Sequence, residues 1–260
     1  MLWYEADSQF EVQKEFMSRI KVLSYNVCST VGMDGVADFR RSAEVIRQAA
    51  PDVAGLEELG VHTRRVPEVD APLEIARYTL MNYLFSRSLV TTPQGGEYGV
   101  GAFSVWTLEL KARLLLPTPE GAEPRSALIA KVNAPPEPFY FAVCHFSYQG
   151  EYEKSELYRQ IGAKLITDTV VDGRFFPCVW VGDFNTFEGS DTLNYIHRHW
   201  LVANDADSRT PTADGTFSGP RQIDFICAYP KEKFTVESFR VLPDRTASDH
   251  NPIEAVLTLK

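Results

Sequence analysis

VWVGDFNT, residues 179–186, is the most informative stretch of this chain. Its apolar half predicts a buried strand, and the glycine lets the backbone turn at the end of that strand without a steric penalty. Because side chains alternate along an extended chain, Asp183 and Asn185 are predicted to lie on the same side of it. A carboxylate can orient or deprotonate a water, and an amide can donate to a phosphoryl oxygen. The pair therefore suits hydrolysis of a phosphate ester.

Other segments have the same form, an apolar strand that carries polar residues at or near its end. They are KVLSYNV with Asn26, DVAGLEEL with Glu57 and Glu58, FYFAVCHFSY with His145, and RQIDFICAY with Asp224. The chain then nearly closes with ASDHNP, which contributes Asp249 and His250. The polar residues are scattered in sequence, but each lies beside a predicted strand.

These segments, in this order, resemble the endonuclease/exonuclease/phosphatase superfamily of metal-dependent phosphoesterases. That superfamily includes DNase I-like nucleases, abasic-site endonucleases, neutral sphingomyelinases and inositol polyphosphate 5-phosphatases. The matching motifs are SYNV, LEEL, HFSY, GDFNT, GTF followed by IDF, and SDHNP. Any one of them is weakly specific, whereas six in family order are strongly specific. They extend over nearly the whole chain.

Size and composition favour one domain over residues 1–260, with its core starting at about residue 20. Hydrophobic residues make up 44% of the chain and charged residues 23%, so a disordered chain is not expected. The net charge of −9 disfavours tight, non-specific binding to duplex DNA, which depends on cationic contacts to phosphates. The four cysteines lie in or beside strand-like runs without metal-binding spacing, which predicts reduced thiols and a cytoplasmic protein. The N-terminus does not look like a signal peptide, and no run is long enough to span a membrane.

The alternation of strands and helices predicts an α/β (α+β) fold, a DNase I-like four-layer α/β/β/α sandwich. Residues 1–19 are expected to form a short helix or strand, and residues 60–82 a helix broken by two prolines. Residues 39–50 predict an amphipathic helix with Phe39, Ala43, Ile46 and Ala50 on one face. The clearest helix begins near residue 151, with Leu157, Ile161 and Leu165 in register.

The resemblance implies catalytic roles for the residues at the strand ends. Asp183 would orient or activate the attacking water, and Asn185 would contact the phosphate. His145 would donate to a phosphoryl oxygen and His250 would contact the scissile phosphate. Asp224 would accept a hydrogen bond from His250, which fixes the tautomer and favours imidazolium.

The resemblance also implies a metal site. Asn26 and Glu58 would form the first metal-binding pair, and Asp249 would be a further ligand, direct or through water. Glu57 and Glu58 point to opposite faces of a regular strand, so only one is expected to reach the site, and the family pattern favours Glu58. Such oxygen ligands suit Mg²⁺, with Mn²⁺ as a substitute.

Substrate binding is implied for three further residues, Arg159, Gln160 and Arg125, at positions where family members carry similar groups. The chain also departs from the family pattern. Gln222 precedes IDF where the family often has arginine, and the strand after Tyr98 lacks a Ser-Arg/Lys-Pro ending. Both departures remove cations that would serve substrate phosphates. Specificity is expected in the loops at residues 91–97, 116–124, 147–153 and 205–221.

The sequence therefore predicts a monomeric, Mg²⁺-dependent hydrolase that cleaves a phosphodiester or phosphomonoester by in-line attack of water. The substrate would be a phosphorylated small molecule or resemble a lipid headgroup. The alternatives are a nuclease, endo- or exonucleolytic, that acts on single-stranded or structured nucleic acid, and a non-catalytic binding module of the same fold.

Overall fold

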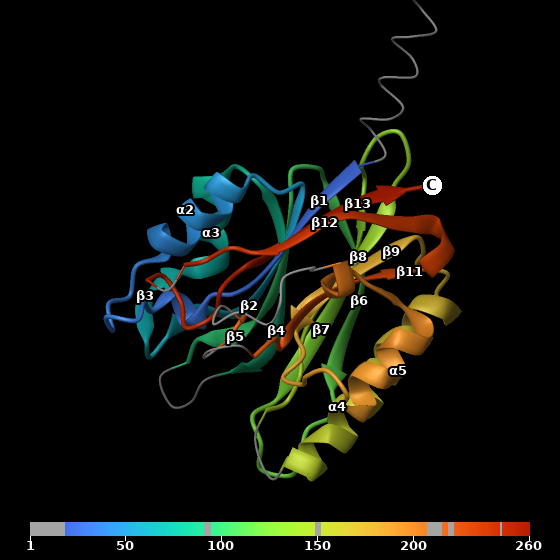
Figure 1. The fold of residues 1–260 in the computed structure, drawn as a ribbon. Coiled ribbons are helices and arrows are strands. Elements are labelled where there is room, and N and C mark those ends of the chain that lie inside the picture. The colour runs from blue at the N-terminus through green and yellow to red at the C-terminus, as the bar shows by residue number, and fades with distance from the viewer. Residues whose placement is uncertain (1–18, 91–94, 149–151, 207–214, 218–220, 245) are drawn as a thin grey trace, which may run out of the picture.

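The computed structural model describes residues 19–90, 95–148, 152–206, 215–217, 221–244 and 246–260. Two β-sheets pack face to face, and helices cover both outer faces (Figure 1). One sheet is covered by α2 (Phe39–Ala49) and α3 (Ala71–Thr79). The other is covered by α4 (Tyr152–Asp172) and α5 (Asp191–His199). This arrangement confirms the predicted four-layer α/β/β/α sandwich.

The first sheet has seven strands in the order β12-β13-β1-β2-β5-β4, with β3 paired to β2. Their bounds are β1 Arg19–Asn26, β2 Val53–Thr63, β3 Val66–Asp70, β4 Asn82–Val90, β5 Glu97–Ser104, β12 Phe234–Val241 and β13 Ile253–Leu259. Strands β1 and β2 are parallel, and Asn26 lies opposite Glu57 in their register. The polar end of β1 therefore lies beside Glu57, in the middle of β2.

The second sheet has six strands in the order β10-β11-β9-β8-β7-β6. Their bounds are β6 Leu108–Leu116, β7 Arg125–Val132, β8 Phe139–His145, β9 Cys178–Asp183, β10 Leu201–Val202 and β11 Asp224–Tyr229. The parallel pair β8 and β9 aligns His145 with Asp183. Strand β11 runs antiparallel to β9, so its first residue, Asp224, lies opposite Asp183.

The core between the sheets consists largely of β-branched and aromatic side chains that are fully buried, among them Val22, Val53, Val143 and Val181. Burying one such side chain stabilises the fold by about 1.5–3 kcal/mol. The two sheets approach closely at Gly55, where an added Cβ would lie 2.2 Å from a methyl of Val181. Only glycine fits there without moving one sheet, so this position helps to set the spacing between the layers.

Three local predictions are wrong. Residues 60–82 are not one interrupted helix, because β2 continues to Thr63, β3 follows, and α3 begins only at Ala71. Pro72 lies in the first turn of α3, where a missing N–H costs nothing, so it starts the helix instead of breaking it. On α2 Ala43 is buried as predicted, but Ala49 is buried in place of Ala50, which is exposed and in the left-handed conformation that ends the helix.

The third wrong prediction concerns the face of α4. Leu157 and Ile161 are exposed, and the buried face instead carries Arg159, Ala163, Ile166 and Val170. The apolar side chains of this helix do not form a single stripe, so periodicity alone does not identify the packed face.

Within the described ranges, no helix is long and apolar enough to cross a membrane. All four cysteines are free thiols, three of them buried and Cys28 half-buried. The structure expected for residues 1–19 falls almost wholly outside the described residues, as do parts of three of the loops expected to carry specificity, residues 91–94, 149–151, 207–214 and 218–220.

Candidate active site

The polar strand ends of both sheets meet at one edge of the sandwich. Asn26 ends β1, His145 ends β8, Asp183 ends β9 and Asp224 begins β11. All four side chains are buried, with 1–2% of their surface exposed. Hydrogen bonds and ion pairs link side chains from the two sheets, such as Asn26 and Asp183. The structure therefore brings together the residues that the sequence places far apart.

The turn after β9 fixes the Asp183–Asn185 pair. The backbone N–H of Asn185 donates to Asp183 Oδ1 at 2.9 Å, and Asn185 has a φ of 48°. In this turn the Asp183 side chain accepts from the backbone two residues later, and the left-handed backbone conformation at position 185 is one that asparagine tolerates. A Cβ at Gly182 would lie 2.0 Å from the carbonyl oxygen of Cys144 on β8, so glycine is required for the two strands to close here. The turn is thus both structural and a means of aiming two functional groups.

His145 lies between these two groups. Its Nε2 is 3.3 Å from Asp183 Oδ2 and 3.1 Å from Asn185 Nδ2. Asn185 Nδ2 also donates to the carbonyl oxygen of Phe146 at 3.0 Å. An acid, an amide and an imidazole therefore converge at the point where β8 and β9 end.

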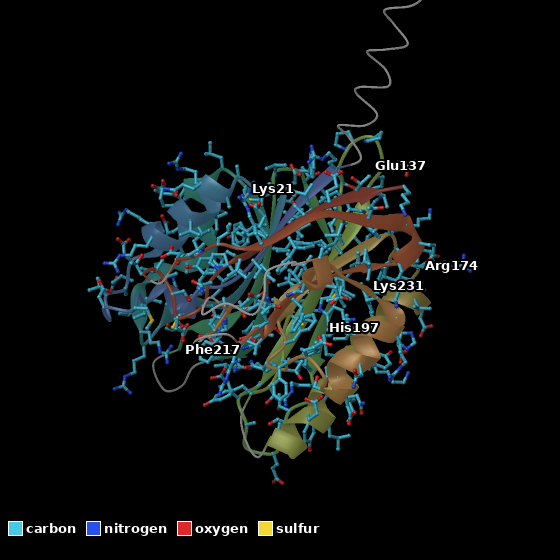
Figure 2. All side chains as sticks on the ribbon, viewed as in Figure 1. Lys21, Glu137, Arg174, His197, Phe217 and Lys231 are labelled. Atoms are coloured by element: carbon cyan, nitrogen blue, oxygen red, sulfur yellow. The ribbon has the colours of Figure 1, made fainter. Side chains whose placement is uncertain are left out.

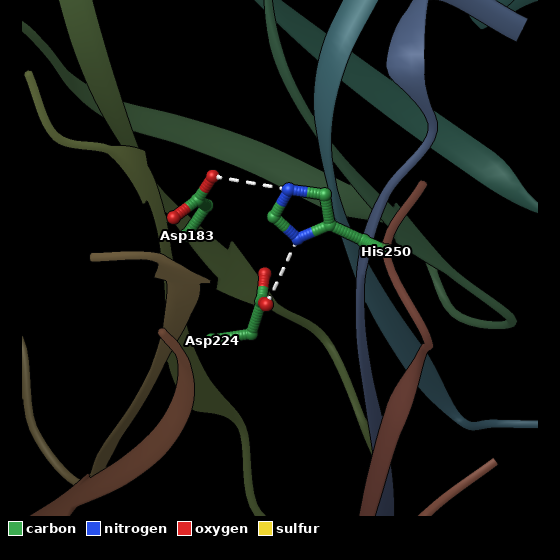
Figure 3. A group of neighbouring side chains, drawn as sticks. All are labelled: Asp183, Asp224 and His250. Atoms are coloured by element: carbon green, nitrogen blue, oxygen red, sulfur yellow. Dashed lines mark hydrogen bonds and ion pairs between the residues drawn. The ribbon is translucent and has the colours of Figure 1, made fainter. Parts of the chain in front are cut away.

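The second imidazole, His250, lies between two carboxylates, as Figure 3 shows. Its Nδ1 is 3.0 Å from Asp224 Oδ2, and its Nε2 is 3.8 Å from Asp183 Oδ2. The ring of Phe217, labelled in Figure 2, packs against the imidazole with centroids 4.7 Å apart. Asp224 therefore holds His250 as the sequence predicts, with Nδ1 protonated and Nε2 turned towards Asp183.

Two hydroxyls that received no role in the sequence analysis hold this pair in place. Ser248 Oγ donates to the carbonyl oxygen of Asn26 at 2.7 Å and accepts from the backbone N–H of His250 at 3.2 Å. Thr216 Oγ1 accepts from the backbone N–H of Asp224 at 3.3 Å. Ser248 lies in the motif SDHNP and Thr216 in the motif GTF. Their membership of these motifs is the sequence signal from which a role could have been predicted.

Burial and nearby charges act in opposite directions on the pKa values of His250 and Asp183, and the nearby charges prevail. Burial lowers the pKa of His250, but the carboxylates of Asp224 and Asp183 outweigh it and raise the pKa to about 10. Burial raises the pKa of Asp183, but His145 and His250 outweigh it and lower the pKa to about 2. At neutral pH, His250 is therefore an imidazolium and Asp183 a carboxylate.

The proposed metal ligands are arranged around the amide of Asn26. Asn26 Nδ2 donates to Asp183 Oδ2 at 3.1 Å and to Glu58 Oε1 at 3.3 Å, while its Oδ1 accepts from the backbone N–H of Cys28 at 3.0 Å. A single amide nitrogen thus faces two carboxylates. Asp249 is exposed and lies near the same groups. Burial and then the charges of Asp249 and Glu58 raise the pKa of the Cys28 thiol to about 12, so both carboxylates lie close to Cys28.

The two adjacent glutamates, Glu57 and Glu58, lie at a β-bulge. A bulge interrupts the pairing of β2 with β5 between Leu56 and Leu59, and Glu58 has a φ of 60°. Glu57 is fully buried, and its pKa is raised well above its ordinary value by burial and then by Asp224 and Asp183. The bulge breaks the regular alternation at Glu58, and which of the two glutamates serves the site stays a prediction.

Arg125, at the start of β7, lies at the edge of the same region. Its guanidinium is 6.0 Å from the centroid of the Tyr98 ring and forms an ion pair with Glu123. Burial lowers the pKa of Arg125, but Tyr98, Glu123 and Glu58 outweigh it and raise the pKa. Its Nε is buried without a hydrogen-bond partner among the described residues. This placement is compatible with the substrate-binding role predicted for Arg125.

Arg159 is held by protein groups. Its side chain is buried, Nε donates to Glu156 Oε2 at 3.0 Å, and Nη1 donates to the carbonyl oxygen of Ser147 at 2.9 Å. The guanidinium thus connects α4 to the loop after β8, and its role in substrate binding stays a prediction. Gln160 is half-buried and lines a pocket of about 420 Å³ with Phe187 and Ser190, so its role in substrate binding stays a prediction.

Another group in the described ranges could also hold a metal ion, since ligand atoms of Asp183, Asp224 and His250 lie within 4.8 Å of one another. In the arrangement seen here, however, both ring nitrogens of His250 face carboxylates and the ring is protonated. A protonated imidazole has no lone pair to give to a metal. The oxygens around Asn26 therefore fit a hard cation better than this group does.

Comparison with known proteins agrees with this geometry. The model of the Endonuclease/Exonuclease/phosphatase family matches residues 23–250, so the chain belongs to that family. Members of the family are hydrolases that act on phosphate esters and generally depend on a divalent metal. Comparison with curated proteins found no match.

Several solved structures share the fold. An endonuclease/exonuclease/phosphatase from Beutenbergia cavernae DSM 12333 is 25% identical, with a TM-score of 0.78 over 93% of this chain and 72% of that chain. A mannosyl-6-phosphatase from Bacteroides thetaiotaomicron VPI-5482 is 18% identical, with a TM-score of 0.73 over 92% of this chain and 100% of that chain. The catalytic domain of human Nocturnin, with a bound sulfate anion, is 17% identical, with a TM-score of 0.70 over 94% of each chain.

Proposed function

We propose that this protein is an Mg²⁺-dependent phosphoesterase that hydrolyses a phosphate ester by in-line attack of water. The observation that carries the proposal is the convergence of Glu58 and Asp183 on one amide nitrogen of Asn26. Asp183 also lies beside the imidazoles of His145 and His250, so Glu58 is the carboxylate of this pair whose negative charge a divalent cation would neutralise. Beside it lie an imidazolium and further donors that suit a phosphate.

The metal would be held by Glu58 and Asn26, with Asp249 contributing directly or through water. Glu58 and Asp249 offer carboxylate oxygens that are at least partly accessible to solvent, which suits Mg²⁺ because this ion keeps several waters. The Oδ1 of Asn26 here accepts from the backbone N–H of Cys28, so the amide would have to turn over to bind the ion. Mn²⁺ would substitute for it. When bound, the ion supplies charge stabilisation to a phosphoryl oxygen and to the departing alkoxide.

The protein's own groups would then act on water and phosphate. Asp183, ionised at neutral pH, accepts a proton of the attacking water and orients it for in-line attack. His250 donates from Nε2 to a phosphoryl oxygen while Asp224 holds Nδ1. The amide of Asn185 and Nε2 of His145 lie on the other side of Asp183 and offer further donors.

The substrate proposed is a phosphorylated small molecule or a group like a lipid headgroup. The net charge of −9 and the absence of arginine at position 222 argue against a phosphate-rich duplex. The charge of Arg125 interacts with Glu58 at this edge, which would suit the binding of a substrate phosphate.

A panel of substrates tests the proposal. Wild type and Glu58→Gln are assayed with Mg²⁺, Mn²⁺ or chelator on phosphomonoesters, the diester bis-p-nitrophenyl phosphate, single-stranded nucleic acid and duplex DNA. We expect metal-dependent turnover of a small ester in wild type and its loss in Glu58→Gln. Equal rates and equal metal dependence in the two proteins would refute the metal assignment. Preference for single-stranded nucleic acid would favour a nuclease, and no turnover on any substrate would favour a non-catalytic binding module.

A further inference from the structure

Glu156, on α4, makes a set of contacts that neither catalysis nor metal binding uses. Its Oε1 accepts from the backbone N–H of Thr192 at 2.7 Å, and its Oε2 accepts from Thr186 Oγ1 at 3.2 Å. Oε2 also accepts from Arg159 Nε at 3.0 Å. Thr192 lies in the first turn of α5, where backbone N–H groups lack partners within the helix and favour a negative charge. One carboxylate therefore holds three segments together.

Arg159 extends these contacts to a fourth segment. Its Nη1 donates to the carbonyl oxygen of Ser147, two residues after His145. Thr186, which donates to Glu156, directly follows Asn185. The Glu156–Arg159 pair thus bridges the loop after β8, which directly follows His145, and the loop after β9, which carries Asn185.

The pair is an expensive way to stabilise a fold. Arg159 is 2% exposed and the side chain of Glu156 is 12% exposed. Taking both charges out of water costs about as much as their attraction returns, so a buried ion pair is often no more stabilising than apolar side chains of the same volume. What an ion pair with directed hydrogen bonds adds is defined geometry. Here the contacted residues are Ser147, two residues after His145, and Thr186, which directly follows Asn185. His145 and Asn185 are the two groups that would contact the phosphate.

We propose that Glu156 and Arg159 are positioning residues that set the separation of His145 and Asn185 in the active site. The inference rests on the proposed function, since the two side chains would have to meet the same phosphate. A displacement of a catalytic group by about 1 Å can lower turnover about 10²-fold. Loosening the bridge should therefore lower kcat much more than it changes KM.

Thr186 offers a matched pair of variants. Thr186→Val keeps the shape of this fully buried side chain and removes the hydroxyl that donates to Glu156, whereas Thr186→Ser keeps the hydroxyl. We expect kcat to fall about 10-fold or more in Thr186→Val, with a smaller change in KM, and most of the loss to be recovered in Thr186→Ser. Glu156→Gln, which removes the charge that faces Arg159, should lower kcat by up to about 10²-fold.

The control is Glu44→Gln. Glu44 pairs with Arg47 at the same spacing of three residues, but the pair is exposed on α2, over the other sheet. We expect Glu44→Gln to leave kcat and KM unchanged. All assays are run well below the melting temperature of each variant. A purely structural role would lower melting temperatures and leave kcat of the folded protein unchanged, which would overturn the inference.

A second readout does not depend on activity. The imidazole NMR signals of His145 report its surroundings directly, and we expect them to shift in Glu156→Gln and Thr186→Val but not in Glu44→Gln. Signals that stay in place in both variants would overturn the inference. If wild type hydrolyses none of the esters, the proposed function fails by itself, and the His145 signals still decide whether Glu156 positions this side chain.

Discussion

Replacing Glu57 by glutamine should stabilise the protein, and increasingly so as the pH rises. Glu57 is fully buried, and neither carboxylate oxygen has a hydrogen-bond partner among the described residues. Burial, with the charges of Asp224 and Asp183, raises its pKa well above the ordinary value of 4.5. The folded protein therefore keeps the proton that the unfolded chain releases, and the contribution of Glu57 to stability falls as the pH rises above 4.5.

The size of the effect follows from proton linkage. Where the folded state holds one proton that the unfolded state has lost, the free energy of unfolding falls by about 1.4 kcal/mol per pH unit. Glutamine does not titrate and has nearly the same volume, and every other titrating group is present in both proteins. Above about pH 5.5, for as long as Glu57 stays protonated in the folded protein, the advantage of Glu57→Gln should grow by about 1.4 kcal/mol per pH unit, or about 3 °C in melting temperature for a chain of this length.

Urea unfolding of both proteins across this pH range measures the difference. A chelator is present, since a cation bound near Glu58 would change the charge around Glu57. Glu44→Gln is the control: hydrogen bonds from Arg47 and Gln48 lower the pKa of Glu44 to about 2, so its contribution is lost only in strong acid and its difference from wild type stays constant here. A difference for Glu57→Gln that does not change with pH would refute the argument. Activity of Glu57→Gln should match wild type.

Four further outcomes are expected. The raised pKa of His250, about 10, contributes stability that is fully present below about pH 6.5 and is lost as the pH rises through about 10. Urea unfolding at alkaline pH should therefore show that wild type loses stability in that interval and that Asp224→Asn loses less. Asp183→Asn should remain folded by circular dichroism while its kcat falls by about 10²–10⁴. Thiol titration in denaturant without reductant should find four free cysteines, and two or none would contradict the structure. Duplex DNA should bind only weakly at physiological salt, so submicromolar binding with a steep salt dependence in gel shifts would contradict the substrate class proposed.

The sequence by itself determined the strand ends and the residues they carry. Apolar runs that stop at Asn26, His145 and Asp183 are local patterns, because burial of a strand and the turn that ends it both depend on neighbouring residues. The order of the motifs then indicated the family and with it the four-layer fold, both of which the comparisons confirm. The bond between Asp224 and His250 was also predicted, from motif order.

Only the tertiary structure decided which side of an element is buried and which charges meet. The bulge at Glu58 arises from the pairing of β2 with β5, so no pattern within β2 could show the backbone conformation that sets the direction of Glu58. Arg159 looks like an exposed helix residue until the loop after β8 places a carbonyl oxygen against it. Burial of a polar side chain depends on partners distant in sequence, because only their hydrogen bonds offset the loss of water. For this reason the catalytic candidates were predictable from the chain, whereas the residues that hold them were not.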